Sequence, residues 1–451
     1  MLKHLLQAKA LDSNIGIRIM IQRIEALNYR SLRYVSQEIR PFQVLVGPNA
    51  SGKSTFLDVV ALLGDFVHYG MSDAILFGSD REKGRASRLD ELIFNQSTDH
   101  FELAVELVVP EHLRPIHQRE YQWQPDTVRY EVAFGNNEKT RELEIRAETL
   151  WLLDSQQRQP NRLEPVNQFP LEPQPPATLM TQESQTPPGW KMVVQKILKS
   201  GQDYFRAETS NWDIMFRVGP HKAALSGVPE DTERFPITIW VRDLLRGGMS
   251  LLALSSAAMR RPVSPSASRR FSLDGANLPL VIQDLKRHHS QSYQDWVAHL
   301  QTILPDLTQI QVYERSEDRH LYLALSVASA SEPVPSWLIS DGTLRLLALT
   351  LLAYVPAENA GIYLIEEPEN GIHPKAVEGI FQSLSSVYRG QVLVATHSPL
   401  FLGLSEPSQL LCFAKNPSGA VDIVSGERHP ALKNWRGEVD ISTLYAAGVL
   451  G

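Results

Sequence analysis

The feature that most constrains the fold is a glycine-rich loop, Gly47-Pro48-Asn49-Ala50-Ser51-Gly52-Lys53-Ser54-Thr55. It matches the phosphate-binding pattern of Gly, any four residues, Gly, Lys and then Ser or Thr. An apolar run at 42–46 precedes the loop, as is typical of a buried parallel strand, and apolar residues at helical spacing follow it. The order strand, glycine-rich loop, helix therefore predicts a nucleotide-binding site rather than a chance glycine turn.

The residue types in this loop suit the chemistry of phosphate groups. Backbone N–H groups from Asn49 to Ser54 would surround a β-phosphate at the positive end of the following helix. The amine of Lys53 would reach the β- and γ-phosphates, and the hydroxyl of Ser54 would bind Mg²⁺. The phosphate-binding residues predicted from the loop are Gly47, Asn49, Ser51, Gly52, Lys53 and Ser54.

Composition narrows the class of protein further. With 451 residues, of which 43% are hydrophobic and 21% charged, the chain is long enough for two or three domains with a large core. No apolar run approaches the roughly 18–20 residues that a membrane span needs, and no secretory signal opens the chain. The single cysteine, Cys412, excludes an internal disulfide and a cysteine-rich metal site. We therefore expect a cytoplasmic protein that does not interact with a membrane.

The charge balance bears on nucleic acid as a partner. A net charge of −7 argues against a surface that is basic throughout, but it leaves room for a local basic groove. Three basic clusters are candidates for such a groove, Arg260-Arg261, Arg269-Arg270 and the segment 286–289. Short basic clusters are more often solvated faces, so nucleic-acid contact is the less favoured interpretation.

The first two thirds of the chain divide by pattern. Residues 20–152 contain the phosphate loop and then alternating segments that predict antiparallel strands with one exposed face, at 101–109, 127–134 and 143–152. Residues 153–189 are rich in Pro and Gln and predict an extended or mobile loop. Residues 190–305 predict a mainly helical insertion, without a long coiled coil because no heptad pattern persists. Residues 1–19 are interpreted as an N-terminal extension.

The last third, residues 306–451, opens with strand-like segments and then alternates helices and strands. Two apolar runs, 361–365 and 391–395, each follow a helical segment and predict buried strands. These strands would share one parallel sheet with the strand before the phosphate loop. The predicted fold class is therefore α/β, with an antiparallel β subregion and a mainly helical insertion.

An acidic pair closes the first of these strands. Glu366 and Glu367 follow the run Ile362-Tyr363-Leu364-Ile365, and the carboxyl end of a parallel strand would face the phosphates. Glu366 would hold Mg²⁺ through water, and Glu367 would be the general base for hydrolysis. The alternative is a solvated acidic turn, because the residues that follow are rich in turn formers.

Two further motifs complete the candidate site. Ser340 and Gly342 lie at a predicted helix start, where free N–H groups and a hydroxyl could bind phosphate. The alternative is that Ser340 or Asp341 simply caps the helix. His397 comes just after a buried strand, and in this ordered set we interpret it as the residue that senses the γ-phosphate.

The order of these motifs resembles an ABC-class ATPase head. The segments Ser340-Asp341-Gly342-Thr343-Leu344-Arg345 and Ile365-Glu366-Glu367-Pro368-Glu369-Asn370-Gly371-Ile372-His373-Pro374 are similar to RecF/SMC-like AAA-family ATPases of prokaryotic defence systems. That group includes the ATPase modules of OLD-family, Septu, Gabija and PARIS-type proteins. The resemblance covers roughly residues 21–70 and 270–451, and we interpret residues 20–152 and 306–451 as the two halves of one ATPase head.

The resemblance also implies site residues, cofactors and partners. It adds Thr55 to the phosphate-binding residues, makes Glu367 and His397 catalytic, and implies ATP and Mg²⁺ as cofactors, with Mg²⁺ on Ser54 and Glu366. Ser340 and Gly342 would contact ATP held by a second copy, so that a homodimer or higher homo-oligomer encloses two nucleotides. Asp341 and Thr343 depart from the common Leu-Ser-Gly-Gly-Gln signature. Gln96 is the candidate for the Mg²⁺-sensing glutamine of such heads.

Four functions remain open at this point. The first is a sensor or regulator that dimerises on ATP and licenses a separate effector, such as a nuclease, in anti-phage defence. A separate effector is expected because the 54 residues after His397 are too few for a nuclease domain. The others are a RecF-like repair ATPase acting on DNA, a transporter ATPase subunit and a slow ATP-binding scaffold. The large insertion disfavours the transporter, and the acidic pair disfavours the scaffold.

Overall fold

The computed structural model describes most of the chain from residue 20 onward. The described residues are 20–77, 85–114, 123–137, 142–154, 166–182, 184, 186–197, 203–210, 212–356, 359–432 and 440–450. The predicted N-terminal extension, residues 1–19, lies outside them, as does part of the predicted loop at 153–189.

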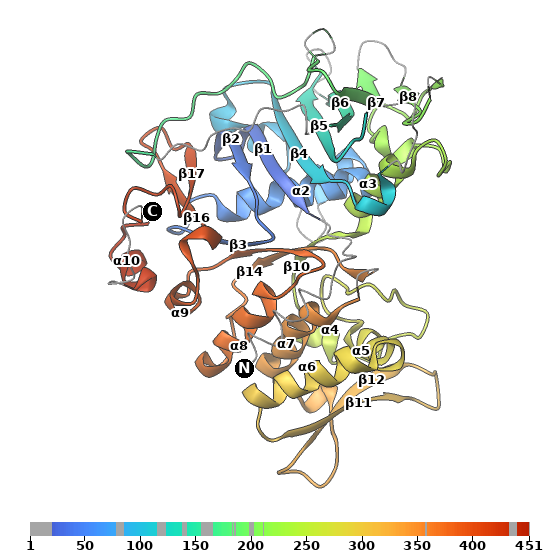
Figure 1. Ribbon diagram of the computed structural model, residues 1–451, viewed down its shortest axis with the longest axis vertical. Helices are drawn as coiled ribbons and strands as arrows, with labels where there is room; N and C mark the ends of the chain where they lie inside the picture. Colours follow the sequence, from blue (N-terminus) through green and yellow to red (C-terminus); the bar gives the residue numbers. More distant parts are fainter. Residues whose placement is uncertain are drawn as a thin grey trace.

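An antiparallel sheet of eight strands forms the upper layer in Figure 1. Its strand order is β2-β1-β4-β5-β6-β7-β8-β9. The strands are β1 (Ile21–Tyr29), β2 (Leu32–Glu38), β4 (His100–Val108), β5 (Thr127–Asn136), β6 (Leu143–Leu153), β7 (Trp190–Ile197), β8 (Asp203–Arg206) and β9 (Asp213–Phe216). The strands predicted from alternation at 101–152 are therefore confirmed.

A second sheet carries the phosphate loop. Its six strands follow the order β10-β14-β15-β3-β16-β17, and all neighbours are parallel except β16 and β17. The strands are β3 (Phe42–Val46), β10 (Met249–Leu252), β14 (Ile362–Glu366), β15 (Gln391–Ala395), β16 (Leu410–Lys415) and β17 (Val421–Ser425). The predicted sharing of one parallel sheet is confirmed, because β15 pairs directly with β3.

Helices cover both faces of this second sheet, and a small third sheet packs at the far end (Figure 1). The third sheet contains β11 (Leu307–Glu314), β12 (Leu321–Val327) and β13 (Val334–Pro335). The helices are α2 (Lys53–Tyr69), α3 (Pro236–Gly247), α4 (Ser256–Met259), α5 (Leu278–His288), α6 (Ser290–Ile303), α7 (Asp341–Leu351), α8 (Pro374–Ser385), α9 (Pro399–Gly403) and α10 (Ile441–Ala446). No helix in the described part of the chain is long and apolar enough to cross a membrane.

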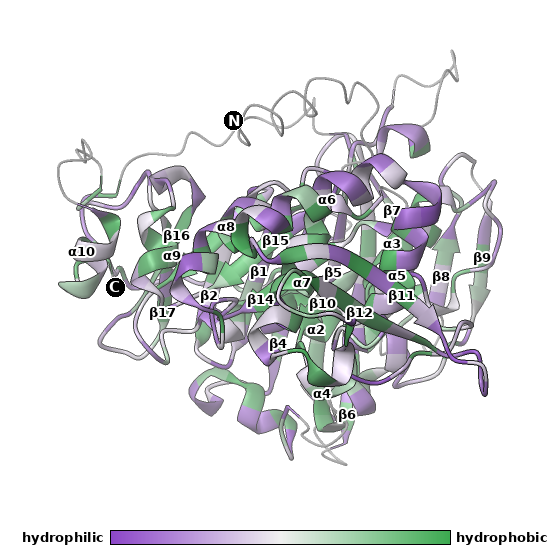
Figure 2. Ribbon diagram, turned by 90° about the horizontal axis from the view of Figure 1, so that it is seen from below, coloured by the Kyte–Doolittle hydropathy of each residue, from purple (hydrophilic) through white to green (hydrophobic). Residues whose placement is uncertain are grey.

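Alternation along the strands of the second sheet divides the core in two. Leu45 of β3 and Leu393 of β15 pack with α2, α3 and the antiparallel sheet. Their neighbours Val44 and Val394 face the opposite side and pack with α5 to α8 and the third sheet. Figure 2 shows hydrophobic residues concentrated along these central strands and hydrophilic residues on outer helices such as α6. Burial on both faces explains why these strands are continuous apolar runs.

The helical insertion predicted at 190–305 needs a correction. Residues 190–216 form β7, β8 and β9, which extend the antiparallel sheet, and β10 joins the parallel sheet beside β14. Pairing with a preformed sheet edge decides the conformation of these short segments, and their own sequence periodicity is too brief to indicate it. Among the described residues of this segment, the first α-helix begins at Pro236.

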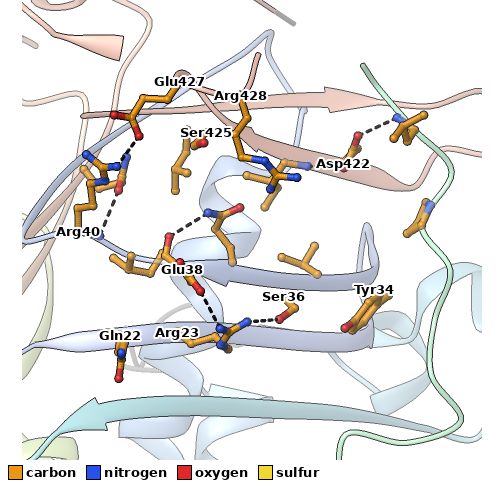
Figure 3. Close-up of a pocket in the computed structure, with 18 of the residues that line it drawn as sticks. Gln22, Arg23, Tyr34, Ser36, Glu38, Arg40, Asp422, Ser425, Glu427 and Arg428 are labelled. Atoms are coloured by element: carbon orange, nitrogen blue, oxygen red, sulfur yellow. Dashed lines mark hydrogen bonds and ion pairs between the residues drawn. The ribbon is translucent and has the colours of Figure 1, made fainter. Parts of the chain in front are cut away.

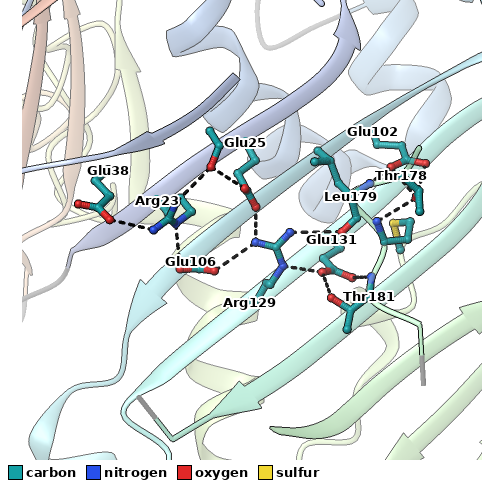
Figure 4. A network of polar contacts seen from close by, with 12 residues as sticks. Arg23, Glu25, Glu38, Glu102, Glu106, Arg129, Glu131, Thr178, Leu179 and Thr181 are labelled. Carbon is teal, nitrogen blue, oxygen red and sulfur yellow. Dashed lines mark hydrogen bonds and ion pairs between the residues drawn. The ribbon is translucent and has the colours of Figure 1, made fainter. Parts of the chain in front are cut away.

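The Pro- and Gln-rich segment contributes a strap, which we define as residues 166–182. The strap contains no helix or strand, and it lies across the outer face of the antiparallel sheet. There the hydroxyl of Thr178 donates to both carboxylate oxygens of Glu102 at 2.9 Å, and the Thr181 backbone N–H donates to Glu131 at 2.9 Å (Figure 4). The predicted loop is thus extended and attached to the sheet by polar contacts.

Candidate functional site

The phosphate loop connects β3 to α2 at the carboxyl edge of the parallel sheet. A Cβ on Gly47 would lie 2.3 Å from the Phe413 carbonyl oxygen, so only glycine fits against the neighbouring strand. Gly52 has φ +99°, and a Cβ there would lie 2.6 Å from Val421. The loop geometry therefore needs both glycines of the motif, and it places the loop at the N-terminus of α2, where backbone N–H groups favour an anion.

Lys53 is buried at the start of α2 with its amine turned back over the loop. Its Nζ donates to the carbonyl oxygens of Gly47 and Pro48, each at 2.8 Å. Burial lowers the pKa of the Lys53 amine to about 8, while the nearby carboxylates of Glu367 and Glu366 act in the opposite direction. A buried cation held only by uncharged oxygens of its own loop is well suited to an anionic ligand, whose charge would favour the protonated amine.

A cavity of about 490 Å³ opens beside this lysine. Its lining residues are Lys53, Ser54, Leu252, Ala253, Leu254, Arg345, Leu349, Ile365, Glu366, Glu367, Pro368, Asn370, Ala395 and His397. The structure therefore brings together five of the predicted site residues, Lys53, Ser54, Glu366, Glu367 and His397. Gly47, Asn49, Ser51, Gly52 and Thr55 belong to the adjoining loop and helix, and Ser340, Gly342 and the candidate Gln96 do not line this cavity.

The acidic pair sits where β14 ends. Glu366 is exposed as the last residue of the strand, and Glu367 turns the chain with φ +46°, a left-handed conformation that is uncommon for a residue with a side chain. The Glu367 N–H donates to the Ala395 carbonyl at 2.8 Å, which fixes this turn against β15. The side-chain amide of Asn370 donates to the Glu367 carboxylate. Backbone and side-chain contacts thus hold Glu367 at the cavity wall.

The residues that could hold a metal here are few. Among the described residues, no group of three or more His, Cys, Asp and Glu side chains could hold a metal ion. The Ser54 hydroxyl and the Glu366 carboxylate both line the cavity and are the oxygen ligands that Mg²⁺ prefers. Mg²⁺ is commonly bound by one or two protein oxygens together with phosphates and water, so this sparse donor set fits a nucleotide-bound ion.

His397 follows β15 and is half-buried at the cavity. Burial and the charge of Lys53 lower the pKa of the imidazole, although Glu367 opposes this shift. Its Nδ1 lies 3.0 Å from the Tyr445 hydroxyl on α10, and that hydroxyl lies 3.4 Å from the Gly47 carbonyl oxygen. Tyr445 is a site residue that the sequence did not indicate, because no motif surrounds it and only the fold of α10 brings it here.

The signature segment starts α7, and its residues Ser340 and Gly342 do not line the cavity. Ser340 is exposed and caps the helix, since its Oγ accepts from the Thr343 N–H at 3.2 Å. The capping interpretation is therefore confirmed, and the phosphate contact of Ser340 stays a prediction. A Cβ on Gly342 would lie 2.5 Å from the Gly371 carbonyl oxygen, so this glycine lets α7 approach the turn after Glu367 closely.

Arg345 links the signature helix to the cavity. Its guanidinium lines the cavity and donates to the Asn370 carbonyl at 2.9 Å. Because Asn370 also contacts Glu367, the start of α7 and the acidic turn are mechanically connected. The sequence contained both residues within quoted motifs but gave no reason to assign either of them a role.

A second and larger cavity, of about 1040 Å³, lies between β2 and β17 and contains none of the predicted site residues. These strands are the edges of the two large sheets. Two ion pairs lie within it, Arg23 with Glu38 at 2.9 Å and Arg40 with Glu427 (Figure 3). The backbone N–H of Leu171 in the strap donates to Asp422 at 2.7 Å. These pairings leave the cavity without a clear preference for one ligand class.

Comparison with known proteins gives a family and a fold. The sequence matches the family described as "AAA domain, putative AbiEii toxin, Type IV TA system" over residues 42–163 and 186–403. The fold is similar to an Smc head solved bound to the C-winged helix domain of ScpA, with a TM-score of 0.50 and 14% identity over 90% of this chain and 97% of that chain. An Smc head with an extended coiled coil, bound to the C-terminal domain of ScpA derived from Pyrococcus furiosus, gives a TM-score of 0.48 and 13% identity over 90% and 96% of the two chains.

Proposed function

The chain belongs to this AAA-domain family and has the fold of an SMC-type ATPase head, and from this premise we propose that it binds and hydrolyses ATP with Mg²⁺. The observation that carries the proposal is the convergence of Lys53, Ser54, Glu366, Glu367 and His397 on one cavity at the end of the parallel sheet. Three separate segments of the chain supply these residues, so their meeting is a property of the fold.

Each residue has a role that its position supports. Lys53 binds the terminal phosphates, and Ser54 with Glu366 holds Mg²⁺, which supplies neutralisation of phosphate charge when bound. Glu367 accepts a proton from the attacking water, and the amide of Asn370 orients its carboxylate. His397 donates a hydrogen bond toward the γ-phosphate. The apolar part of the cavity lining comes from the end of β10 and the residues after it, with Leu252 and Leu254, and from α7, with Leu349.

We infer that two copies of the chain close around two nucleotides. Ser340 and Gly342 do not line their own chain's cavity, which suits a contact with ATP bound by a second copy. Trp337 and Leu338, just before them, are 50% and 70% exposed. Large apolar side chains exposed beside a phosphate-binding helix start favour an interface at this surface.

The biological role that we propose is regulation of a separate effector, such as a nuclease, in anti-phage defence. The solved Smc head that this fold resembles is bound to the C-winged helix domain of ScpA, which supports a separate partner chain for this protein. A RecF-like role on DNA is the second candidate. It is less favoured because Arg260 pairs with Asp341 and Arg269 pairs with Asp284, each at 2.5 Å, which neutralises part of the basic clusters.

The decisive experiment is the variant Glu367→Gln. It keeps the size of the side chain and its contact with Asn370 but removes the base, so ATP binding should survive while turnover falls about 10²- to 10⁴-fold. ATP and Mg²⁺ should then trap a dimer that wild-type protein forms only transiently. Phosphate release and sedimentation velocity with and without ATP measure both effects.

The matched control is Glu378→Gln on the exposed side of α8. It makes the same chemical change at a distance from the cavity, and its turnover and oligomeric state should equal those of wild type. Unchanged turnover in Glu367→Gln would refute the assignment of the base. A monomer in ATP for that variant, with hydrolysis lost, would instead refute the dimer.

A further inference from the structure

Tyr445 is the residue through which the C-terminal helix reaches the nucleotide cavity. It lies in α10, which packs beside α9 (Figure 1). Its hydroxyl sits between two parts of the site, 3.0 Å from Nδ1 of His397 and 3.4 Å from the carbonyl oxygen of Gly47. Burial raises the pKa of the Tyr445 phenol, so the hydroxyl keeps its proton and can donate it.

The chemistry of His397 makes this contact consequential. A neutral imidazole carries one ring proton, and only the nitrogen that bears it can donate to an anion such as phosphate. The hydrogen bond made by one ring nitrogen sets which nitrogen is protonated. Because burial and Lys53 lower the pKa of His397, the ring is neutral at neutral pH and the position of its proton matters.

We propose that Tyr445 donates its hydroxyl proton to Nδ1 of His397 and thereby keeps the ring proton on Nε2, where it can be donated toward the γ-phosphate. Tyr445 is a positioning residue that acts through His397, and this role rests on the proposed ATPase function. The hydroxyl has one proton to give, and it lies nearer to Nδ1 than to the Gly47 oxygen. The longer contact with Gly47 joins α10 to the phosphate loop. Packing of this helix is therefore linked to the position of the ring proton on His397.

Two charged groups also act on the imidazole, and they come from other elements. Lys53 on α2 disfavours the imidazolium, and Glu367 after β14 favours it. Both groups are present in wild type and in a Tyr445 variant. The ratio of the turnover rates of the two proteins at each pH therefore removes their contribution. The ratio then reports the tyrosine alone.

The first test needs no nucleotide. Nitrogen-15 NMR of histidine-labelled protein, with His397 assigned by the variant His397→Gln, should show Nε2 protonated and Nδ1 unprotonated in wild type. Tyr445→Phe should admit both tautomers. A wild-type ring protonated on Nδ1, or a tautomer that Tyr445→Phe leaves unchanged, would overturn the proposal. This measurement stands whether or not the protein hydrolyses ATP.

The second test is the pH dependence of ATP turnover. Loss of one hydrogen bond should lower the turnover of Tyr445→Phe about three- to tenfold near pH 8. The deficit should shrink below the pKa of His397, because the imidazolium has a proton on both nitrogens. A deficit that is the same at every pH would mean a structural role only and would contradict the proposal.

The chain offers a matched control for both measurements. Tyr354 makes a similar contact away from the site, with its hydroxyl 3.2 Å from Nδ1 of His299. Tyr354→Phe should leave the His397 tautomer and the pH profile as in wild type, and its thermal unfolding calibrates the cost of losing such a contact. If wild type does not hydrolyse ATP, the proposed function fails, while the NMR result still decides the tyrosine contact.

Discussion

Two clusters of charged side chains in this protein solve opposite problems. On the outer face of the antiparallel sheet, Arg129 is surrounded by Glu131 at 2.5 Å, Glu106 at 3.1 Å and Glu25 (Figure 4). All four are buried, and the carboxylates raise the pKa of Arg129 although burial acts to lower it. Each charge in this network is satisfied by the protein itself.

The cluster at the nucleotide cavity is left incomplete. Lys53 is buried but contacts only oxygens of its own loop, and among the described residues neither Glu366 nor Glu367 forms an ion pair within 4.0 Å. Charges in a fold are normally paired when they are buried. The contrast teaches that the Arg129 network is completed within the protein, and it supports the proposed role of the cavity cluster in binding a charged ligand.

The largest effect should come from breaking the complete network with Arg129→Met. The substitution leaves the buried carboxylates of Glu25 and Glu131 without a paired cation, and Glu106 with only Arg23 at 3.4 Å. The free energy of unfolding should therefore fall by about 3–5 kcal/mol. The loss should be smaller at pH 5 than at pH 8, because protonation of the uncompensated carboxyls stabilises the variant. Urea unfolding at both pH values measures this, and nucleotide affinity of the folded fraction should stay at the wild-type level.

Arg33→Met is the control for this change. Arg33 lies on β2 of the same sheet and pairs with Glu172 at 2.5 Å, but both partners are largely exposed. An exposed pair contributes about 0–1 kcal/mol, so the two variants should differ severalfold in stability. Equal losses would mean that burial does not distinguish the two pairs, and the comparison between the clusters would fail.

Lys53→Met tests the incomplete cluster and should give the reverse result. Without the amine, ATP turnover should fall about 10²- to 10³-fold, as expected when a preorganised charge is removed from a phosphate site. The free energy of unfolding should stay within about 1 kcal/mol of wild type, because removal of a desolvated amine offsets the loss of its hydrogen bonds to the loop. Phosphate release and urea unfolding give the two values.

Lys415→Met provides the comparison for Lys53→Met. Lys415 is exposed at the end of β16, two strands from β15 in the same sheet. Its loss should change neither turnover nor stability measurably. If Lys53→Met proves as destabilising as Arg129→Met, the lysine serves the fold, and the interpretation of the cavity is wrong.

The sequence predicted the incomplete cluster and not the complete one, for a physical reason. Lys53, Glu366 and His397 follow strands of a parallel sheet, and local motifs mark each position. Arg129 and its carboxylates come from strands β1, β4 and β5, and they look like the polar half of ordinary alternating segments. Only the strand register and the strap reveal that this polar face is buried.

The same reasoning explains the other differences. Strands β7 to β9 were predicted as helix because their conformation is decided by pairing with β6 and with one another. Tyr445 was not predicted at all, since its contact with His397 joins residues 48 positions apart without any periodic signal. Local sequence patterns thus predicted the long alternating strands and the elements that adjoin a motif. Tertiary contacts decided the short strands β7 to β9 and the position of Tyr445.

A smaller effect is expected where the strap meets the sheet. Glu102→Gln removes a buried carboxylate that accepts from the Leu179 N–H and from Thr178, so the free energy of unfolding should fall by about 1–3 kcal/mol. Burial acts to raise the pKa of Glu102, but hydrogen bonds from His100, Leu179 and Thr178 outweigh it and lower the pKa below its ordinary value. Wild type should therefore keep this stabilisation above about pH 4.5 and lose it as pH falls through the folded-state pKa.

Limited proteolysis within the strap is the direct measurement. Glu102→Gln should be cut faster than wild type at neutral pH, and wild type should approach the variant under acid conditions. The control Glu378→Gln alters an exposed carboxylate on α8, outside the strap, and should change cleavage little. Equal cleavage of all three proteins would show that the strap is not held by Glu102.

The smallest effect concerns the ion pair between Arg260 and Asp341, which could serve either the fold or an interface with a ligand or partner. Arg260 pairs with Asp341 at 2.5 Å and donates to the Ile339 carbonyl at 2.8 Å, so it holds both sides of Ser340. The pair is partly exposed, and Arg260→Gln should cost less than about 1 kcal/mol of stability. Nucleotide binding by a monomer should be unchanged, whereas the ATP-dependent dimer should weaken a few-fold because the signature segment is less rigid.

The neighbour Arg261 makes this prediction sharp. Arg261 is exposed, and a basic nucleic-acid surface would use both arginines. In that case Arg260→Gln and Arg261→Gln would each weaken DNA binding. Each would also lower the slope of log affinity against log salt concentration by about one. If Arg260 instead serves the dimer interface, only Arg260→Gln changes ATP-dependent association, and neither variant alters the affinity for DNA. Sedimentation in ATP and DNA titrations at two salt concentrations separate the outcomes. An equal loss of DNA affinity in both variants would mean that Arg260 and Arg261 contact nucleic acid, and it would favour the RecF-like role.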